Sequence, residues 1–364
     1  MVRVMPGREA PMTDRLERVV ADIARKWTPD PRLGVLEVAV QAAGIGGVGG
    51  GAGGGSLTGC TTSRDALAAL RRLAAAAGLA ADVRLLPDAS VGEESAAVVT
   101  ATVAPLVREP RGAADCVSEA LHGETLAVLE RRDGVWLRVR TGDGYHAWIH
   151  TGYVAAGPAD WADDWTDRAT ACSLGAELRC EDARFRLAVG ARVAPQRGGR
   201  VETADGRVWS VAAGVVRTVA EVRAEARLHA PPEWALRWFS GAPYRWGGRT
   251  EWGVDCSGLV QATYAARGLS LPRDADLQSL AGGDVKIHPE GVGYEAGDVV
   301  CFTDGRRISH VALWAGAGRI VHSALSRGGV ASDDLLADTP AAKRLRDYLV
   351  AVRRVSLPHE ARPV

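Results

Sequence analysis

The chain has 364 residues, of which 47% are hydrophobic and 24% are charged, with 44 basic and 44 acidic side chains. This length predicts two or three domains, and the composition is ordinary for a globular protein. The zero net charge excludes a chain-wide field that would attract nucleic acid or an anionic membrane. No apolar run approaches the roughly 18 residues of a membrane span. The six cysteines include no C-x-x-C pair, so neither a zinc site nor a disulfide framework is expected.

The N-terminal quarter predicts a small α/β elaboration over residues 1–94. Apolar residues recur at helical spacing in 13–27, and 32–40 reads as a strand. The glycine tract 44–56 has no Gly-Lys-Ser/Thr ending, so we expect a flexible hairpin loop and no phosphate site. Residues 63–79 predict a helix with a serine cap before it and a glycine near its end. The first thirty residues lack the apolar core of a signal peptide. A cytoplasmic protein is therefore expected, with export by a non-standard route as the alternative.

Two segments of short alternating strands follow, over residues 95–160 and 161–216. Arg132–Gly134 and Asp205–Gly206 are typical of hairpin turns between such strands. A connecting helix is predicted from Thr218. Tight turns at regular intervals favour small β-barrels, and the second segment has the weaker pattern.

Residues 217–364 contain the residues that could carry chemistry. Cys256 lies in Asp-Cys-Ser-Gly at the start of a helix predicted over 256–267. His310 and His322 lie on two predicted antiparallel strands, and a hairpin centred near Gly316 would place them directly opposite each other.

Thiol, imidazole and a second imidazole together indicate nucleophilic catalysis. A cysteine at a helix N-terminus meets unpaired N–H groups, which favour its thiolate. An imidazole can take the thiol proton, and a further group can orient that imidazole. Two alternatives are weighed: a buried packing cysteine, and a Cys-His-His zinc site, in which the metal would quench the nucleophile. The remaining cysteines, Cys301 among them, are predicted to be packing residues. His288 is expected in a loop, and surface roles are predicted for His122, His146 and His150.

The motifs PYRWGG, DCSGLV and the two histidines twelve residues apart resemble the NlpC-type papain-like cysteine peptidases of bacteria. The resemblance is strong over about residues 230–355. It implies an α+β protein in which a papain-like catalytic domain is preceded by two SH3-like β-barrels. Carried over by position, Cys256 is the nucleophile, His310 the base and His322 the orienting group. Tyr244 matches the tyrosine whose hydroxyl lies beside the nucleophile.

The same resemblance implies hydrolysis of the bond between γ-D-glutamate and the diamino acid of a murein peptide, releasing L-Ala-γ-D-Glu. Asp274, in Leu-Pro-Arg-Asp, matches the aspartate that binds the free amine of the substrate's L-alanine, although Ala275 stands where many relatives have serine. Tyr145, in GYHAWI, matches a barrel tyrosine that meets this amine. The other residues assigned to substrate binding are Glu119, Asp255 and Ser257.

A cleft closed by the first barrel would admit a murein tripeptide or tetrapeptide with a free amine, which predicts a recycling enzyme. No metal or organic cofactor is expected, nor a nucleic-acid or membrane partner, and the working expectation is a monomer. Two alternatives stay open. One is a secreted endopeptidase that acts on the intact wall, and the other is a catalytically silent wall-binding module.

Overall fold

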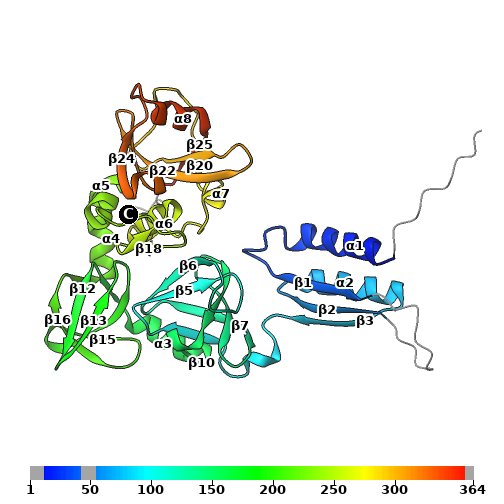
Figure 1. Cartoon of the computed structure of the whole chain (residues 1–364). Coiled ribbons are helices and arrows are strands. Elements are labelled where there is room, and N and C mark those ends of the chain that lie inside the picture. The colour runs from blue at the N-terminus through cyan, green and yellow to red at the C-terminus, as the bar shows by residue number, and fades with distance from the viewer. Residues whose placement is uncertain (1–11, 42–54, 357–364) are drawn as a thin grey trace, which may run out of the picture. The chain divides into compact units, whose positions relative to one another are not determined.

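The computed structural model describes residues 12–41 and 55–356 (Figure 1). All but the last two residues of the glycine tract, predicted as a flexible hairpin loop, lie outside the described residues. The chain divides into two compact units, one of Met1–Gly92 with Val128–Arg131, the other of Glu93–Ala127 with Arg132–Val364. Within the described ranges, no helix has both the length and the apolar character needed to cross a membrane. The bounds of the four domains drawn from the sequence stay predictions.

In the first unit, two helices share a core with a three-stranded sheet of order β1-β2-β3. The elements are α1 (Met12–Trp27), β1 (Leu36–Gln41), β2 (Ser56–Thr61), α2 (Arg64–Ala77) and β3 (Ala80–Leu85). Val20 of α1 and Leu70 of α2 are buried with Leu57 of the sheet. The predicted cap of α2 is confirmed, because the Ser63 hydroxyl accepts a hydrogen bond from the Ala66 N–H.

Two β-modules follow along the chain, each a seven-stranded sheet. The first contains β4 (Ala96–Val99), β5 (Val103–Val107), β6 (Cys116–Leu121), β7 (Thr125–Arg132), β8 (Trp136–Arg140), β9 (His146–His150) and β10 (Val154–Gly157). After helix α3 (Ala159–Arg168), the second contains β11 (Ala171–Ser173), β12 (Ala176–Cys180), β13 (Ala183–Leu187), β14 (Arg192–Gln196), β15 (Arg200–Glu202), β16 (Val208–Ala213) and β17 (Val216–Thr218). Both predicted turns are present, with left-handed backbone at Asp133, Gly134 and Gly206.

His122 contradicts the expected surface role, because it is fully buried where the two β-modules meet. Its Nε2 accepts a hydrogen bond from the Ala204 N–H at 3.1 Å. Its Nδ1 must therefore carry the proton of the neutral ring, and it lies 3.1 Å from the Thr100 carbonyl oxygen. Burial lowers the pKa of His122, which keeps this ring neutral.

The rest of the second unit is a helix-and-sheet assembly with a six-stranded sheet of order β20-β25-β21-β22-β23-β24. Its helices are α4 (Val219–Leu228), α5 (Pro231–Phe239), α6 (Cys256–Ala266), α7 (Ala275–Gln278) and α8 (Pro340–Tyr348). Its strands are β18 (Arg249–Thr250), β19 (Gly253–Val254), β20 (Gly283–Asp284), β21 (Val299–Thr303), β22 (Ile308–Gly316), β23 (Arg319–Ala324), β24 (Gly329–Asp334) and β25 (Leu349–Arg354).

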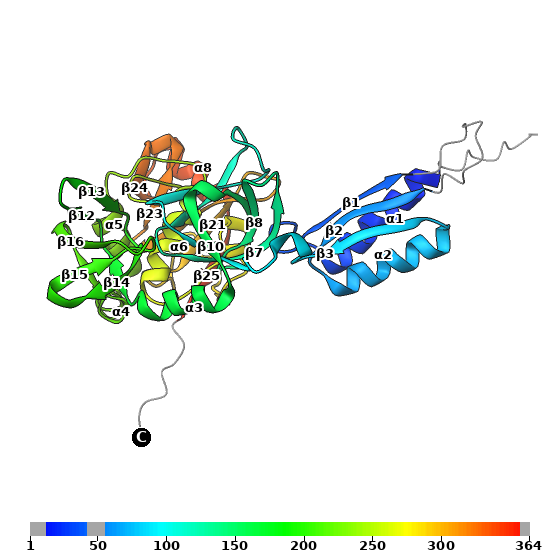
Figure 2. The ribbon, with the colours of Figure 1, turned by 90° about the horizontal axis from the view of Figure 1, so that it is seen from below.

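This sheet is covered on both faces (Figures 1 and 2). On one face, Leu259 of α6 and Phe239 of α5 pack against Val311 and Leu313 of β22. On the other face, α8 covers a second apolar cluster that includes Trp314. Helix α6 therefore contacts both the sheet and the first β-module, and its first residue, Cys256, is buried.

Candidate active site

Cys256 is the first residue of α6, and Asp255 before it caps the helix. The Asp255 carboxylate accepts hydrogen bonds from the Gly258 N–H at 2.7 Å and from the Gly247 N–H at 2.8 Å. One carboxylate thus ties the start of the helix to the loop of the Trp-Gly-Gly motif. This fixes the backbone on which the thiol is carried.

Two glycines let that loop approach the helix closely. A Cβ placed on Gly258 would lie 2.2 Å from the Gly248 carbonyl oxygen, and one on Gly248 would lie 2.3 Å from the Gly253 carbonyl oxygen. Neither distance can accommodate a side chain, because the obstructing atoms belong to the backbone. Gly258 is therefore required by the contact between the helix and the loop, and Gly248 by the contact of the loop with Gly253.

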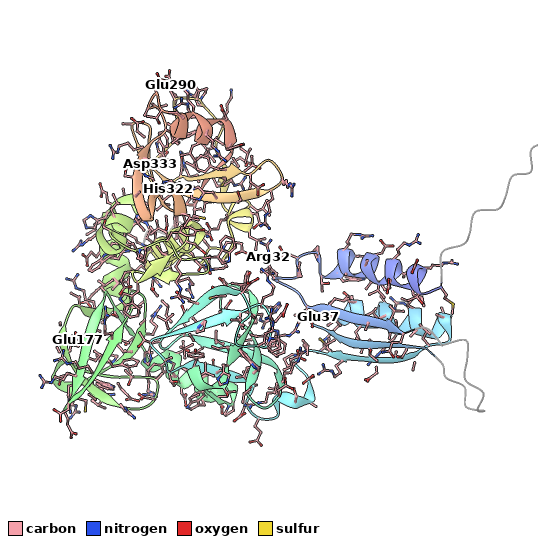
Figure 3. The ribbon with its side chains drawn as sticks, in the orientation of Figure 1. Arg32, Glu37, Glu177, Glu290, His322 and Asp333 are labelled. Atoms are coloured by element: carbon pink, nitrogen blue, oxygen red, sulfur yellow. The ribbon has the colours of Figure 1, made fainter. Side chains whose placement is uncertain are left out.

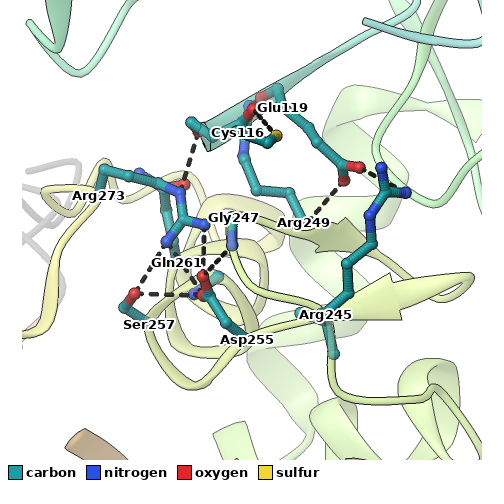
Figure 4. Close-up of polar contacts among 12 residues, drawn as sticks. Cys116, Glu119, Arg245, Gly247, Arg249, Asp255, Ser257, Gln261 and Arg273 are labelled. Atoms are coloured by element: carbon teal, nitrogen blue, oxygen red, sulfur yellow. Dashed lines mark hydrogen bonds and ion pairs between the residues drawn. The ribbon is translucent and has the colours of Figure 1, made fainter. Parts of the chain in front are cut away.

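Arg273 also holds the Asp255 carboxylate in place (Figure 4). Its guanidinium is 1% exposed and binds Asp255 through two hydrogen bonds, of 3.0 and 2.7 Å. It also donates to the Ser257 hydroxyl at 2.8 Å and to the Ser118 hydroxyl of the first β-module at 3.0 Å. A buried charge needs this kind of complete pairing. Sequence reasoning missed Arg273, although an arginine beside the apolar Leu271 could have signalled a buried partner.

The thiol of Cys256 is held in its protonated form. Burial raises the pKa of Cys256 to about 11, and the nearby Asp255 carboxylate adds to the rise. Hydrogen bonding from the backbone at Val311 and Ser257 acts in the opposite direction. Desolvation thus outweighs the backbone hydrogen bonds that favour the thiolate, and the expected activation of Cys256 stays a prediction. The contact with Val311 places the thiol beside the residue that follows His310.

The two histidines are hydrogen-bonded to each other, with His310 Nε2 2.8 Å from His322 Nδ1. The sequence predicted that the two histidines would lie directly opposite each other, but the strand register does not place them so. Leu313 pairs with Val321, so Ala312 faces His322 and His310 lies two residues further along the same face. The difference arises at the turn, because Gly316 pairs with Arg319 and the hairpin is centred between Ala317 and Gly318, later than predicted. A diagonal pair on neighbouring strands remains within reach of long side chains, which is why the hydrogen bond forms.

A third side chain continues this line on the next strand. His322 Nε2 lies 3.1 Å from Asp333 Oδ2, and the other carboxylate oxygen of Asp333 pairs with Arg327 at 2.8 Å. Figure 3 shows His322 and Asp333 close together in the six-stranded sheet. The sequence did not reveal Asp333, because β24 was not predicted as a strand.

Both histidines are neutral at physiological pH. Burial lowers the pKa of His310 to about 3, and the neighbouring His322 lowers it further. Burial also lowers the pKa of His322, against the opposing effect of Asp333. A neutral imidazole is the form that can accept a proton from the thiol.

The Tyr244 side chain is half-buried near the thiol of Cys256. Burial raises its pKa to about 12, with further contributions from Cys256 and Asp255. Its hydroxyl therefore stays protonated and can donate a hydrogen bond beside the nucleophile. The backbone N–H of Tyr244 donates to Gly328, which anchors this residue to the turn before β24.

The first β-module is bound to the catalytic region by charged contacts. Glu119, 1% exposed, accepts from the Arg249 N–H at 2.9 Å and pairs with Arg245 at 3.0 Å (Figure 4). The Arg249 guanidinium binds Glu124 with two hydrogen bonds of 3.0 Å. Gln261 of α6 donates to Asp143 of the module at 2.6 Å.

The predicted substrate-binding residues gather around Arg273. Asp274 and Tyr145 both influence the pKa of the Arg273 guanidinium, so they lie near it from the catalytic region and from the first β-module respectively. Tyr145 is buried, and Asp274 precedes α7 as its N-cap residue, with its backbone carbonyl accepting a hydrogen bond from the Gln278 N–H. The carboxylate of Asp255 and the hydroxyl of Ser257 already have protein partners, as does Glu119. Substrate contacts for these residues stay predictions.

A cavity of about 430 Å³ lies elsewhere, between both β-modules and the far end of α6. Gln261 and Leu269 line it, but neither Cys256 nor the two histidines do. The reactive groups and this cavity are therefore separate features.

The other cysteines follow the packing prediction only in part. Cys301 is fully buried in β21, as expected. Cys180 is exposed, so the expectation that it is a packing residue is wrong. It ends β12 at the edge of a hairpin, where the side chain faces solvent.

Comparison with known proteins decides the family of two segments. Residues 241–353 match the NlpC/P60 family, and residues 106–152 match the bacterial dipeptidyl-peptidase SH3 domain. The region that contains Cys256, His310 and His322 is thus similar to the NlpC/P60 family. The SH3 match covers most of the first β-module, whose Glu119 and Asp143 contact this region.

Individual relatives match short segments of the chain. The chain is 41% identical over 88 residues to a gamma-D-glutamyl-L-lysine dipeptidyl-peptidase of Bacillus subtilis, covering 23% of this chain and 28% of that protein. It is 38% identical over 121 residues to a bifunctional muramidase/DL-endopeptidase of the same organism, covering 32% and 33%. It thus matches about a third or less of the length of these relatives.

A solved NlpC/P60 family protein from Bacillus cereus has the same fold. It superimposes with a TM-score of 0.59 at 20% identity, covering 71% of this chain and 99% of that one. The expected α+β architecture, with SH3-like modules ahead of a papain-like domain, is therefore confirmed.

Proposed function

We propose that the chain is a cysteine peptidase that hydrolyses the γ-D-glutamyl–diamino acid bond of murein peptides with a free N-terminal L-alanine. The observation that carries this proposal is the buried Cys256 at the start of α6, beside a strand whose His310 is hydrogen-bonded to His322. The name of the 41% identical relative supports the bond that is cleaved.

In the proposed reaction, the Cys256 thiol gives its proton to His310 as the sulfur attacks the γ-carbonyl carbon. The tetrahedral oxyanion would receive hydrogen bonds from backbone N–H groups near Cys256 and from the Tyr244 hydroxyl. The C–N bond then breaks, and the proton on His310 passes to the departing amine. Water, deprotonated by His310, hydrolyses the thioester and restores the thiol. Burial raises the pKa of the thiol and lowers that of His310, so both groups start the reaction in their neutral forms.

The requirement for a free amine follows from the groups around Arg273. Asp274 would pair with the alanine ammonium, and Tyr145 of the SH3 module would lie against it. The buried link between Arg273 and Ser118 supports a cleft whose wall is this module. Such a site favours short peptides, and we propose a role in recycling released murein peptides in the cytoplasm.

Replacing Asp274 tests this proposal. Losing a hydrogen bond to a charged group costs on the order of 1.5–3 kcal/mol, so Asp274→Asn should lower kcat/KM for L-Ala-γ-D-Glu-diamino acid tripeptide roughly ten- to a hundredfold. Acetylating the substrate amine should lower the kcat/KM of the wild-type enzyme by at least the same factor.

Asp276→Asn, the same change two residues further along α7, is the matched control and should keep the preference for the free amine. Equal cleavage of the free and acetylated peptides by the wild type would contradict the amine-gated cleft. It would favour an endopeptidase of the intact wall, the alternative suggested by the name of the muramidase/DL-endopeptidase relative. A wall-binding module without activity would cleave neither peptide.

A further inference from the structure

His310, His322 and Asp333 form a line across three neighbouring strands. His322 faces Ala331 on β24, and Asp333 lies two residues further along the same face. The step from His322 to Asp333 therefore repeats the diagonal step from His310 to His322. Each step carries a hydrogen bond, of 2.8 Å between the rings and 3.1 Å to the carboxylate.

The carboxylate decides where the protons lie on both rings. An ionised carboxylate only accepts hydrogen bonds, so a neutral His322 must carry its proton on Nε2. Its Nδ1 is then an acceptor, and the donor in the bond between the rings must be His310 Nε2. The remaining nitrogen of His310, Nδ1, is left without a proton and can accept one.

We propose that Asp333 is a positioning residue that sets this tautomer of both histidines and so leaves His310 Nδ1 free to take the Cys256 proton. The inference rests on the proposed peptidase function of the same site. When the thiol proton moves to His310, positive charge develops on the paired rings. The carboxylate at the end of the line stabilises that charge.

Arg327 binds the Asp333 carboxylate from the solvent side. Its guanidinium pairs with the second oxygen of Asp333, and its own side chain is 52% exposed. The carboxylate oxygen bonded to His322 stays available to the ring, because Arg327 occupies the other one. The ion pair also places a positive charge beside the carboxylate, on the side away from His322.

A test independent of any substrate reads the tautomers directly. Long-range ¹H–¹⁵N spectra of ¹⁵N-histidine-labelled full-length protein, with only eight histidines to assign, should show His310 and His322 both protonated at Nε2. Asp333→Ala should convert His322 to a mixture of tautomers. Asp333→Asn keeps an acceptor oxygen and should preserve the wild-type tautomer more fully.

The matched control is Asp334→Asn, because Asp334 neighbours Asp333 on β24 but binds the Leu336 N–H and not a histidine. Unchanged ring spectra in Asp333→Ala, as in Asp334→Asn, would overturn the proposal. This outcome is distinct from failure of the proposed function, which would appear as a wild-type protein with the expected tautomers and no cleavage of the tripeptide.

Steady-state kinetics of the Asp333 variants provides a second test of the positioning role. Asp333→Ala should lower kcat about ten- to a hundredfold, the range for losing a charge-assisted hydrogen bond, with little change in KM. Asp333→Asn should lie between Asp333→Ala and wild type. A loss confined to KM, or equal kcat in Asp333→Ala and Asp334→Asn, would refute a positioning role. Thermal melting of each variant separates these results from loss of the fold.

Discussion

On the helix side of Cys256, Asp255 receives hydrogen bonds from two backbone N–H groups and from Arg273, and all of these partners are buried or nearly so. On the strand side, His310, His322 and Asp333 are joined by one hydrogen bond at each step, and the last pair ends at the exposed Arg327. The helix side holds the nucleophile in place through many bonds. The strand side has few bonds, and each of them fixes where a proton lies.

The largest effects should come from the groups that react. Cys256→Ala removes only the sulfur and should abolish turnover, a loss of about 10⁴-fold or more, without unfolding the protein. His310→Ala should be nearly as severe. His322→Ala should be milder, because an orienting group contributes less than a nucleophile or base. The measurement is kcat/KM for the tripeptide, with Asp334→Asn as control. Turnover by Cys256→Ala would exclude Cys256 as the nucleophile.

The helix side should respond chiefly in stability. Arg273→Met leaves the Asp255 carboxylate buried without its partner, which costs about 3–5 kcal/mol of the free energy of unfolding. Arg327→Met breaks an exposed pair on the strand side and should cost at most about 1 kcal/mol. Denaturant midpoints of the two variants measure the difference directly.

Adding Asp255→Asn to Arg273→Met should restore part of the lost stability, since both charges are then absent. Equal midpoints for Arg273→Met and Arg327→Met would show that the buried pair is not what holds the helix side together.

The smallest effect concerns pH. Because burial lowers the pKa of His310 to about 3, its base form persists below the ordinary histidine value of 6.5, and kcat/KM should change little between pH 7 and pH 5. Stability should behave differently. Unfolded histidines bind protons below 6.5 while the buried ones do not, so the free energy of unfolding should fall as pH falls from 6.5. Tm and kcat/KM measured together from pH 8 to pH 4.5 check this. An acidic limb of kcat/KM centred near 6.5 would contradict it.

Local signals in the sequence were sufficient for the elements that carry Cys256 and the histidines. The serine cap of α2 and the start of α6 could be predicted because caps and apolar spacing are local features. The histidine pairing was predicted, but its register was not. Gly316 pairs with Arg319, so the turn lies later than predicted, and the register of a hairpin depends on the turn that forms.

What the sequence could not show depends on distant contacts. β24, with the segment Gly-Val-Ala-Ser-Asp-Asp, lacks the β-branched alternation of a strand and forms because β23 pairs with it, so Asp333 was missed. Arg273 is buried only because Ser118 and Asp255, far apart in the chain, meet around it. His122 was placed at the surface because its burial needs the second β-module, which no local pattern reports.

The close approach of Gly248 to Gly258 has a consequence for protein engineering. The loop that contains the Trp-Gly-Gly motif and the helix that contains the nucleophile fit together as backbone against backbone, with no side chain able to adjust between them. A graft that transfers only the nucleophile segment into another scaffold would omit the loop whose backbone contacts the helix. Chimeras should therefore exchange residues 244–258 as one cassette, and a single methyl group added at Gly258 should be enough to push the two halves apart.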